Sequence, residues 1–316
     1  MKSSDVAVAV QPTARTGARR HRRARARAWF VAAMLSPAIV TLAALTLYPF
    51  ASNVYNSLFD WSLSKPNSRS FVFLGNYVDI LFRNADFRHA LWVSVCFTVG
   101  AVVLELLLGL FIASLLNRIA RRGLLLTLFI LPMAATPIAI TFVWRMMFSP
   151  SLGILNYFLT LVGLPASNWV ANSSIVIPCL IVVDAWQWTP FVILVLLGGL
   201  LSLPVEPAEA AAMDGANAWE IFRHITLPLL EPFVILVVLF RTIDAFKTFD
   251  LIFVMTTGGP GNASESLNIY TFRQGFWFLN MGYAAALAII MLVIVIVISQ
   301  ILLKRSRLQV GSRAES

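Results

Sequence analysis

Several ionisable side chains lie inside stretches of the sequence that are otherwise apolar. Asp184 lies in one such stretch, while Arg241 and Asp244 lie in another. A charged group surrounded by apolar residues is costly unless it faces a water-filled cavity or an opposite charge. These residues therefore indicate either a polar binding site or an internal ion pair.

Two helical faces would bring such groups together. Asp184, Trp188 and Phe191 have the spacing i, i+4, i+7, which places them on one face of a helix. The second stretch repeats this spacing with Arg241, Asp244 or Ala245, and Thr248. Carboxylate and guanidinium groups make directional hydrogen bonds, and an indole ring packs well against C–H groups. The two faces predict a substrate path suited to a polyhydroxylated molecule such as a sugar.

A purely structural interpretation of the same residues stays open. Arg241 and Asp244, at i and i+3, could neutralise one another and lock helices together. Lys247 and Asp250 lie closer to the end of their stretch, which favours a scaffolding or gating role. Glu105, in a third apolar stretch, is interpreted as structural.

The elements that must position these residues are membrane-spanning helices. Of the 316 residues, 59% are hydrophobic and 12% are charged, whereas a soluble domain has about 25% charged residues. A hydrocarbon core is crossed by about 20 residues of helix. Six stretches are long and apolar enough: Trp29–Phe50, Ala90–Leu116, Leu124–Met147, Ile175–Leu201, Pro232–Met255 and Ala284–Leu303. The sequence thus predicts an all-α polytopic membrane protein.

The distribution of Lys and Arg predicts the orientation of these spans. Sixteen of the 24 basic residues fall on one side of the predicted membrane, eight of them before Trp29. By the positive-inside rule both termini are then cytoplasmic. The Arg-rich segment is interpreted as a topology signal lying on anionic lipid, in preference to a nucleic-acid-binding tail. The predicted organisation is a disordered basic tail over 1–28, a transmembrane domain over 29–303, and a cytoplasmic tail over 304–316.

A long cytoplasmic connection joins the fourth and fifth spans. Residues 203–228 begin with Pro207 and a run of Ala, Glu and Met, which favours a helix, and Gly215 is a natural residue to end it. A second short amphipathic helix follows from Ala218 to Ile225, and Pro228 is expected to end it before the fifth span. Taken alone, this pattern fits either a protein-docking element or a helix lying on the lipid surface.

The same connection carries a motif with fixed spacing. Glu209-Ala210-Ala211, three residues, Gly215, nine residues and then Ile225-Thr226-Leu227-Pro228 resemble the EAA motif of binding-protein-dependent ABC importer permeases. Three further segments are similar to the carbohydrate branch of that family, which includes the larger maltose-permease subunit: Leu131-Pro132, Trp186 to Pro190, and Phe249-Asp250 through Thr257-Gly258-Gly259-Pro260. The resemblance extends over roughly residues 29–303.

The resemblance implies a fold, a function and a set of partners. The fold would be the six-helix core of a type I importer permease, in the plasma membrane of a bacterium. The chain would translocate a sugar or polyol delivered by an extracytoplasmic binding protein, together with a second six-helix permease subunit and two copies of a cytoplasmic ATP-binding subunit. The docked coupling segment would comprise Glu209, Ala210, Ala211, Asp214 and Gly215. The chain itself would be no enzyme and hold no cofactor, since it has no G-x-x-x-x-G-K-[ST] run for ATP.

The resemblance also bears on the substrate path. In the maltose branch, the ligand-contacting positions correspond to Asp184, Trp188, Phe191, Arg241, Ala245 and Thr248 of this chain. Several uncharged residues of that branch are replaced here, at Asp184, Trp188, Arg241 and Ala245. Either a different ligand or the absence of direct contact with this subunit would follow.

Three other functions are weighed against this one. A proton-coupled secondary transporter could use Asp184 or Asp244 as a relay, but no internal repeat is evident. An ABC permease for a non-sugar solute is the nearest rival. An intramembrane enzyme or metal site is disfavoured, because the three histidines lie outside the spans, and Cys96 and Cys179 are isolated in apolar runs.

Overall fold

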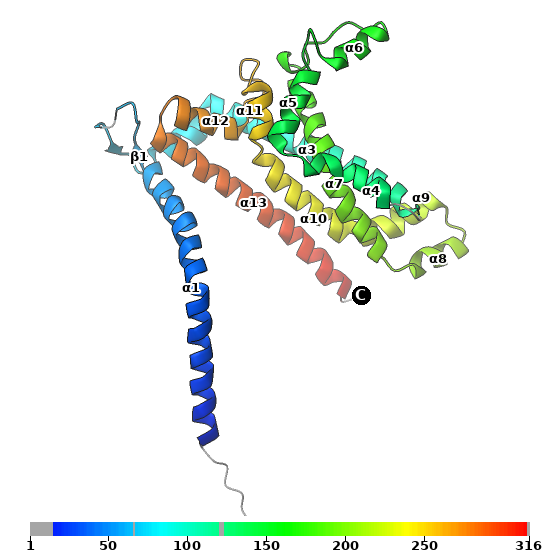
Figure 1. The fold of residues 1–316 in the computed structure, drawn as a ribbon, viewed down its shortest axis with the longest axis horizontal. Helices are drawn as coiled ribbons and strands as arrows, with labels where there is room; N and C mark the ends of the chain where they lie inside the picture. Colours follow the sequence, from blue (N-terminus) through cyan, green and yellow to red (C-terminus); the bar gives the residue numbers. More distant parts are fainter. Residues whose placement is uncertain (1–14, 66, 120–122, 315–316) are drawn as a thin grey trace, which may run out of the picture. The chain divides into compact units, whose positions relative to one another are not determined.

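The computed structural model describes residues 15–65, 67–119 and 123–314. By internal contacts the chain divides into two compact units, residues 1–55 and 56–316. The elements are helical apart from a two-stranded antiparallel ribbon, in which β1 (Phe59–Asp60) pairs with β2 (Ser70–Phe71). Figure 1 shows the long helices α3, α7, α10 and α13 of the second unit.

Helix α1 (Arg15–Ser57) contains the first predicted span. The part from Trp29 to Ser57 is apolar enough to cross a membrane, and none of its most apolar window is buried within the protein. The predicted disordered tail over 1–28 needs correction, because helix begins at Arg15, while residues 1–14 lie outside the described residues. Arg and Ala are both strong helix formers, which accounts for the extension.

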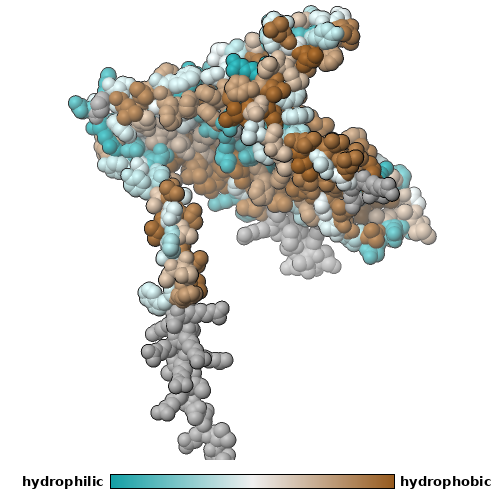
Figure 2. Space-filling model, viewed as in Figure 1, coloured by the Kyte–Doolittle hydropathy of each residue, from teal (hydrophilic) through white to brown (hydrophobic). Residues whose placement is uncertain are grey.

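Four further helices overlap predicted spans, with shifted bounds. They are α3 (Ala85–Asn117), α7 (Val176–Ser202), α10 (Leu227–Phe246) and α13 (Met281–Ala314). Helix α13 runs into the predicted C-terminal tail, of which residues 315–316 lie outside the described residues. Exposed Leu, Val, Ile and Phe side chains cover much of the visible face of this unit (Figure 2), as expected for helices whose outer solvent is lipid.

The third predicted span is broken rather than continuous. It consists of α4 (Gly123–Ala134) and α5 (Pro137–Met147), which are bent by 90° at the break. Thr136 is extended (φ −65°, ψ 134°), because the ring of Pro137 disfavours helical geometry in the residue before it. The span predicted over Leu124–Met147 is therefore made of two helices that together are long and apolar enough to cross a membrane.

The fifth predicted span also ends earlier than expected. Helix α10 ends at Phe246, and a separate helix α11 (Asp250–Thr256) begins after a break of three residues. The carbonyl of Lys247 accepts a hydrogen bond from Asn268 Nδ2 at 2.6 Å, which replaces the partner it would have inside a helix. Lys247 thus lies in a polar break, and not inside an apolar helix as the bounds Pro232–Met255 implied.

Shorter elements complete this unit. Helices α2 (Gly75–Val78) and η1 (Asp79–Arg83) precede α3. Helices α6 (Ile154–Leu161) and η2 (Trp169–Ala171) lie in the uncharged 148–174 segment. After α11 come α12 (Leu267–Phe272) and η4 (Arg273–Trp277). Between α11 and α12, Glu265 is buried and accepts a hydrogen bond from Arg273 Nη1 at 2.6 Å. Burial raises the pKa of Glu265, while the charge of Arg273 opposes that rise.

Helices α3 and α7 pack closely because small residues line their contact. A Cβ added at Gly109 would lie 2.5 Å from Val192 Cγ1, and one at Gly100 would lie 2.5 Å from Ile181 Cδ1. Apolar surface alone does not drive helices together in lipid, so association relies on such close packing.

We predict that Gly109→Ala destabilises the protein, because the added methyl group overlaps Val192. Overpacking of this kind costs about 1–3 kcal/mol and should lower the thermal unfolding midpoint of the purified protein. Gly198→Ala, on α7, is the matched control, since a Cβ there meets no atom within 4 Å. A midpoint for Gly109→Ala equal to that of Gly198→Ala would refute the close-packing argument.

Candidate functional site

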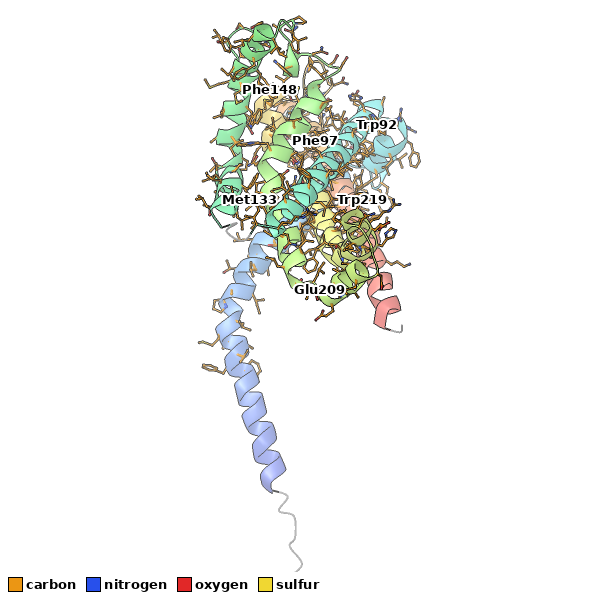
Figure 3. The ribbon with its side chains drawn as sticks, turned by 90° about the vertical axis from the view of Figure 1, so that its right-hand side faces the viewer. Trp92, Phe97, Met133, Phe148, Glu209 and Trp219 are labelled. Atoms are coloured by element: carbon orange, nitrogen blue, oxygen red, sulfur yellow. The ribbon has the colours of Figure 1, made fainter. Side chains whose placement is uncertain are left out.

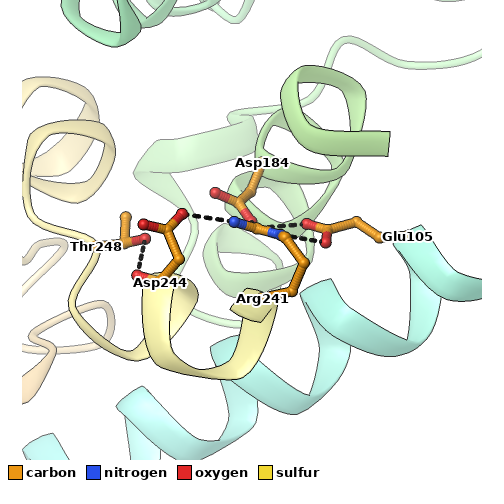
Figure 4. A network of polar contacts seen from close by, with 5 residues as sticks. All are labelled: Glu105, Asp184, Arg241, Asp244 and Thr248. Carbon is orange, nitrogen blue, oxygen red and sulfur yellow. Dashed lines mark hydrogen bonds and ion pairs between the residues drawn. The ribbon is translucent and has the colours of Figure 1, made fainter. Parts of the chain in front are cut away.

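One buried guanidinium binds three carboxylates from three helices (Figure 4). Arg241 Nε and Nη2 donate to the two carboxylate oxygens of Glu105, at 2.5 and 2.7 Å. Arg241 Nη2 also donates to Asp184 Oδ2 at 2.7 Å, and Nη1 donates to Asp244 Oδ2 at 2.6 Å. The side chains of Arg241, Glu105 and Asp184 are no more than 3% exposed, whereas that of Asp244 is 50% exposed.

The helices explain how the sequence assembles this cluster. Glu105 comes from α3, Asp184 from α7, and Arg241 with Asp244 from α10, which packs against both other helices. The predicted pairing of Arg241 with Asp244 at i, i+3 is present, but it is the most exposed of the three ion pairs. Glu105 is structural, as predicted, although its partnership with Arg241 was not foreseen. A lone carboxylate in an apolar span requires a partner, so the position of Glu105 could have indicated that it pairs with a basic residue of another span.

A cavity of about 310 Å³ opens beside this cluster. Its lining includes four of the predicted substrate-path residues: Asp184, Trp188, Asp244 and Thr248. It also includes Lys247 and Phe249 from the break after α10, Asp250 at the start of α11, and Pro137 at the start of α5. The bend in the third span and the early end of α10 therefore both contribute to the wall of the cavity.

Three predicted substrate-path residues do not line this cavity. Arg241 lies behind its wall, where it holds Asp184 and Asp244, and its Cζ lies 4.9 Å from the centre of the Trp188 ring. Ala245 is buried in the apolar core, and Phe191 packs against Phe240 with ring centres 6.4 Å apart. Helical spacing placed them on the correct elements, but packing turned Ala245 and Phe191 towards apolar neighbours.

Gln187 is a cavity residue that the sequence interpretation missed. It is 4% exposed and lines the cavity, and no hydrogen bond joins its side-chain amide to any residue that the structure describes. Buried amide groups in proteins nearly always have a hydrogen-bond partner. A polar side chain in the apolar run of α7 was the signal that could have revealed it.

The predicted coupling segment includes a short helix that is largely exposed. Helix α8 (Glu206–Met213) has no buried residue, and Met213 is 88% exposed. Gly215 has φ +89°, as a residue that ends a helix in left-handed geometry requires. The Gly215 amide donates to Ala212 O and the Ala216 amide donates to Ala211 O, which together form a Schellman motif. The prediction that Gly215 ends this helix is confirmed.

The second half of the connection differs from its prediction. Asn217 begins α9 (Ala218–Ile221) with a capping box, in which its side chain accepts from the Glu220 amide and Glu220 Oε2 accepts from the Asn217 amide. Pro228 does not end this helix, because it lies in the first turn of α10, where a missing N–H is tolerated. The helical path is continuous from Ala218 through η3 (Phe222–Thr226) to Phe246. Glu209 and Trp219 mark the exposed connection in Figure 3.

Comparison with known proteins identifies the family. Residues 105–307 match the model of the binding-protein-dependent transport system inner membrane component. The chain belongs to this family of permeases. It is 37% identical to a probable ABC transporter permease of Sinorhizobium fredii, over 93% of this chain and 94% of that one. It is 38% identical to the trehalose/maltose transport system permease MalF of Thermococcus litoralis, over 73% of this chain and 77% of that one.

A solved structure confirms the fold of this permease. It is similar, with a TM-score of 0.78 and 21% identity, to a chain of a bacterial ABC transporter that imports the acidic polysaccharide alginate. The similarity covers 91% of this chain and 98% of the other. The type I permease fold is thus confirmed, and the chain is a multi-pass inner-membrane protein.

We predict that Arg241→Met strongly destabilises this permease, because Glu105 and Asp184 would remain buried without a cation. Removal of one partner from a buried ion pair costs about 3–5 kcal/mol, which should appear as a large drop in the thermal midpoint.

Arg145→Met is the matched control for this change. Arg145 is an exposed arginine on α5 that donates to Val254 O at 2.8 Å, so we expect a much smaller effect. Equal midpoints for the two variants would show that the Arg241 cluster does not hold the helices together.

Proposed function

We propose that this permease translocates a carbohydrate, a sugar or polyol, delivered by an extracytoplasmic binding protein. The observation that carries this proposal is the cavity beside Arg241, which combines carboxylates, the amide of Gln187, the hydroxyl of Thr248 and the ring of Trp188. Hydroxyl groups need directional donors and acceptors, and the C–H face of a sugar packs on an indole. The relative named for trehalose and maltose transport supports the same cargo class.

Transport would be driven by ATP on a separate cytoplasmic subunit. Helix α8 has no buried residue, carries Glu206 and Glu209 in its first turn, and has small alanine side chains that allow close approach. We infer that the segment Glu209, Ala210, Ala211, Asp214 and Gly215 docks on this ATPase, of which two copies would serve two permease subunits. No ATP or other cofactor would bind to the permease itself, and both termini would be cytoplasmic.

Movement of the docked segment has a direct route to the cavity. The capping box at Asn217 begins a helical path that continues to Phe246, and Lys247 in the next position lines the cavity. A rigid helix of this length would convert a shift at α8 into a shift of Arg241 and the cavity wall. That coupling is how nucleotide binding would alternate the access of the site.

The decisive test of the function is uptake of labelled trehalose, maltose and sorbitol by cells that carry or lack this gene. We expect uptake of at least one of them to require the gene, and to stop when cellular ATP is depleted while the proton gradient is maintained. Uptake that continues without ATP but stops with an uncoupler would support a proton-coupled transporter instead. The membership of the permease family does not favour that alternative.

We predict that Gly215→Asp disrupts docking of the ATPase subunit, because a carboxylate would be buried without a partner in the interface. Uptake should fall about tenfold or more, which corresponds to a loss of about 1.4 kcal/mol or more in coupling. The ATPase subunit should also fail to co-purify with the variant.

Gly163→Asp is the matched control for the backbone and the charge. Gly163 has φ +79° and Gly215 has φ +89°, and an added Cβ meets no atom within 4 Å at either position. Gly163 lies in the 148–174 segment, on the predicted outer side, so co-purification of the ATPase subunit should persist. If both variants retain that subunit equally well, α8 is not the docking element.

A further inference from the structure

The charges on the cavity wall are unequal in sign. Asp184, Asp244 and Asp250 line the cavity, whereas Lys247 is the one basic residue among its lining residues. The positive charge of Arg241 compensates for only part of this excess, because one guanidinium is shared among Glu105, Asp184 and Asp244. A ligand in the cavity therefore meets a wall of net negative charge.

Gln187 independently indicates that an uncharged polar group binds here. The residue is 4% exposed and lines the cavity, and no hydrogen bond joins its side-chain amide to another described residue. An amide offers both a donor and an acceptor, which a ligand hydroxyl can satisfy. The wall thus combines a hydrogen-bonding position for a neutral group with repulsion of anions.

We propose that this cavity accepts neutral and positively charged carbohydrates and rejects carbohydrate acids, with Asp244 as the specificity-determining residue. This inference rests on the proposed function and names the substrate class of its site. Like charges brought together in a partly desolvated site repel strongly, and discrimination often depends on such repulsion. The fold does not impose this choice, since a transporter chain of the same fold imports acidic alginate.

Asp244 is the determinant because it stands between Arg241 and the cavity. It is the exposed member of the cluster, lines the cavity, and occupies Arg241 Nη1 at 2.6 Å. Asp244→Asn removes one negative charge from the wall and weakens the pairing of the guanidinium, so that a ligand carboxylate can approach it. Glu105 and Asp184 keep Arg241 in place in this variant, which preserves the packing of α3, α7 and α10.

Direct binding to the assembled transporter complex tests this proposal without selection by the binding protein. The complex is placed in nanodiscs of zwitterionic phosphatidylcholine, and saturation-transfer NMR measures the binding of glucose, glucosamine and glucuronate at pH 7. We expect signals from glucose and glucosamine. We expect the affinity for glucuronate to be at least about tenfold lower than the affinity for glucose. Trp188→Ala should abolish the glucose signal, which locates the binding in this cavity.

Two variants separate a local effect from a general effect of charge. Asp244→Asn should raise the glucuronate affinity about tenfold, because the wall loses a charge next to Arg241. Asp86→Asn removes the same charge from the first turn of α3, outside the cavity lining, and should leave the preference unchanged.

Three results would overturn the inference: equal binding of glucuronate and glucose by the unaltered complex, equal effects of the two variants, or no binding of any of the three sugars. Each would leave the proposed function standing, because ATP-dependent uptake is measured separately. Failure of that uptake would instead refute the importer, even if the cavity showed the expected preference.

Discussion

The burial of Arg241 between carboxylates is the interaction on which the arrangement of the spans depends. Its guanidinium is held by Glu105 of α3 and Asp184 of α7, so that three membrane-spanning helices meet at one charged group. A charge at this depth is tolerated only because every N–H that points at a carboxylate recovers part of the lost hydration. The same contacts set the position of Asp184, Asp244 and Trp188 at the cavity. In these ion pairs Arg241 holds the helices together, while its partners Asp184 and Asp244 also line the cavity.

The second unit combines a tightly packed region with an exposed projection. Close contact at Gly109 fixes α3 against α7, whereas α8 has no buried residue. A surface helix with this little packing has few interactions of its own to hold it. Its caps, the Schellman motif at Gly215 and the capping box at Asn217, satisfy the backbone groups that packing would otherwise protect. Helix α8 can therefore be exposed and still keep a defined shape.

Much of the exposed surface of this protein is apolar. The span of α1 has no buried residue in its most apolar window, and large apolar side chains are exposed along the helices of the second unit. Lipid tails are as apolar as these side chains and solvate them as well as contact with another helix would. The polar cavity and α8 consequently carry more information about partners and cargo than the apolar surface does.

The sequence by itself determined the class of the protein, the places of the apolar spans and the end of α8 at Gly215, because these follow from hydropathy, charge bias and local backbone preference. The EAA spacing predicts the coupling segment from the sequence alone, since the motif lies within one continuous piece of chain. Tertiary structure alone decided that Glu105 partners Arg241, that Gln187 faces the cavity, and that Ala245 and Phe191 turn away from it. Helical spacing names a face, but which neighbour that face meets depends on how α3, α7 and α10 pack. Likewise, the break after Phe246 depends on Asn268, a residue distant in sequence. The side-chain amide of Asn268 donates a hydrogen bond to the carbonyl of Lys247.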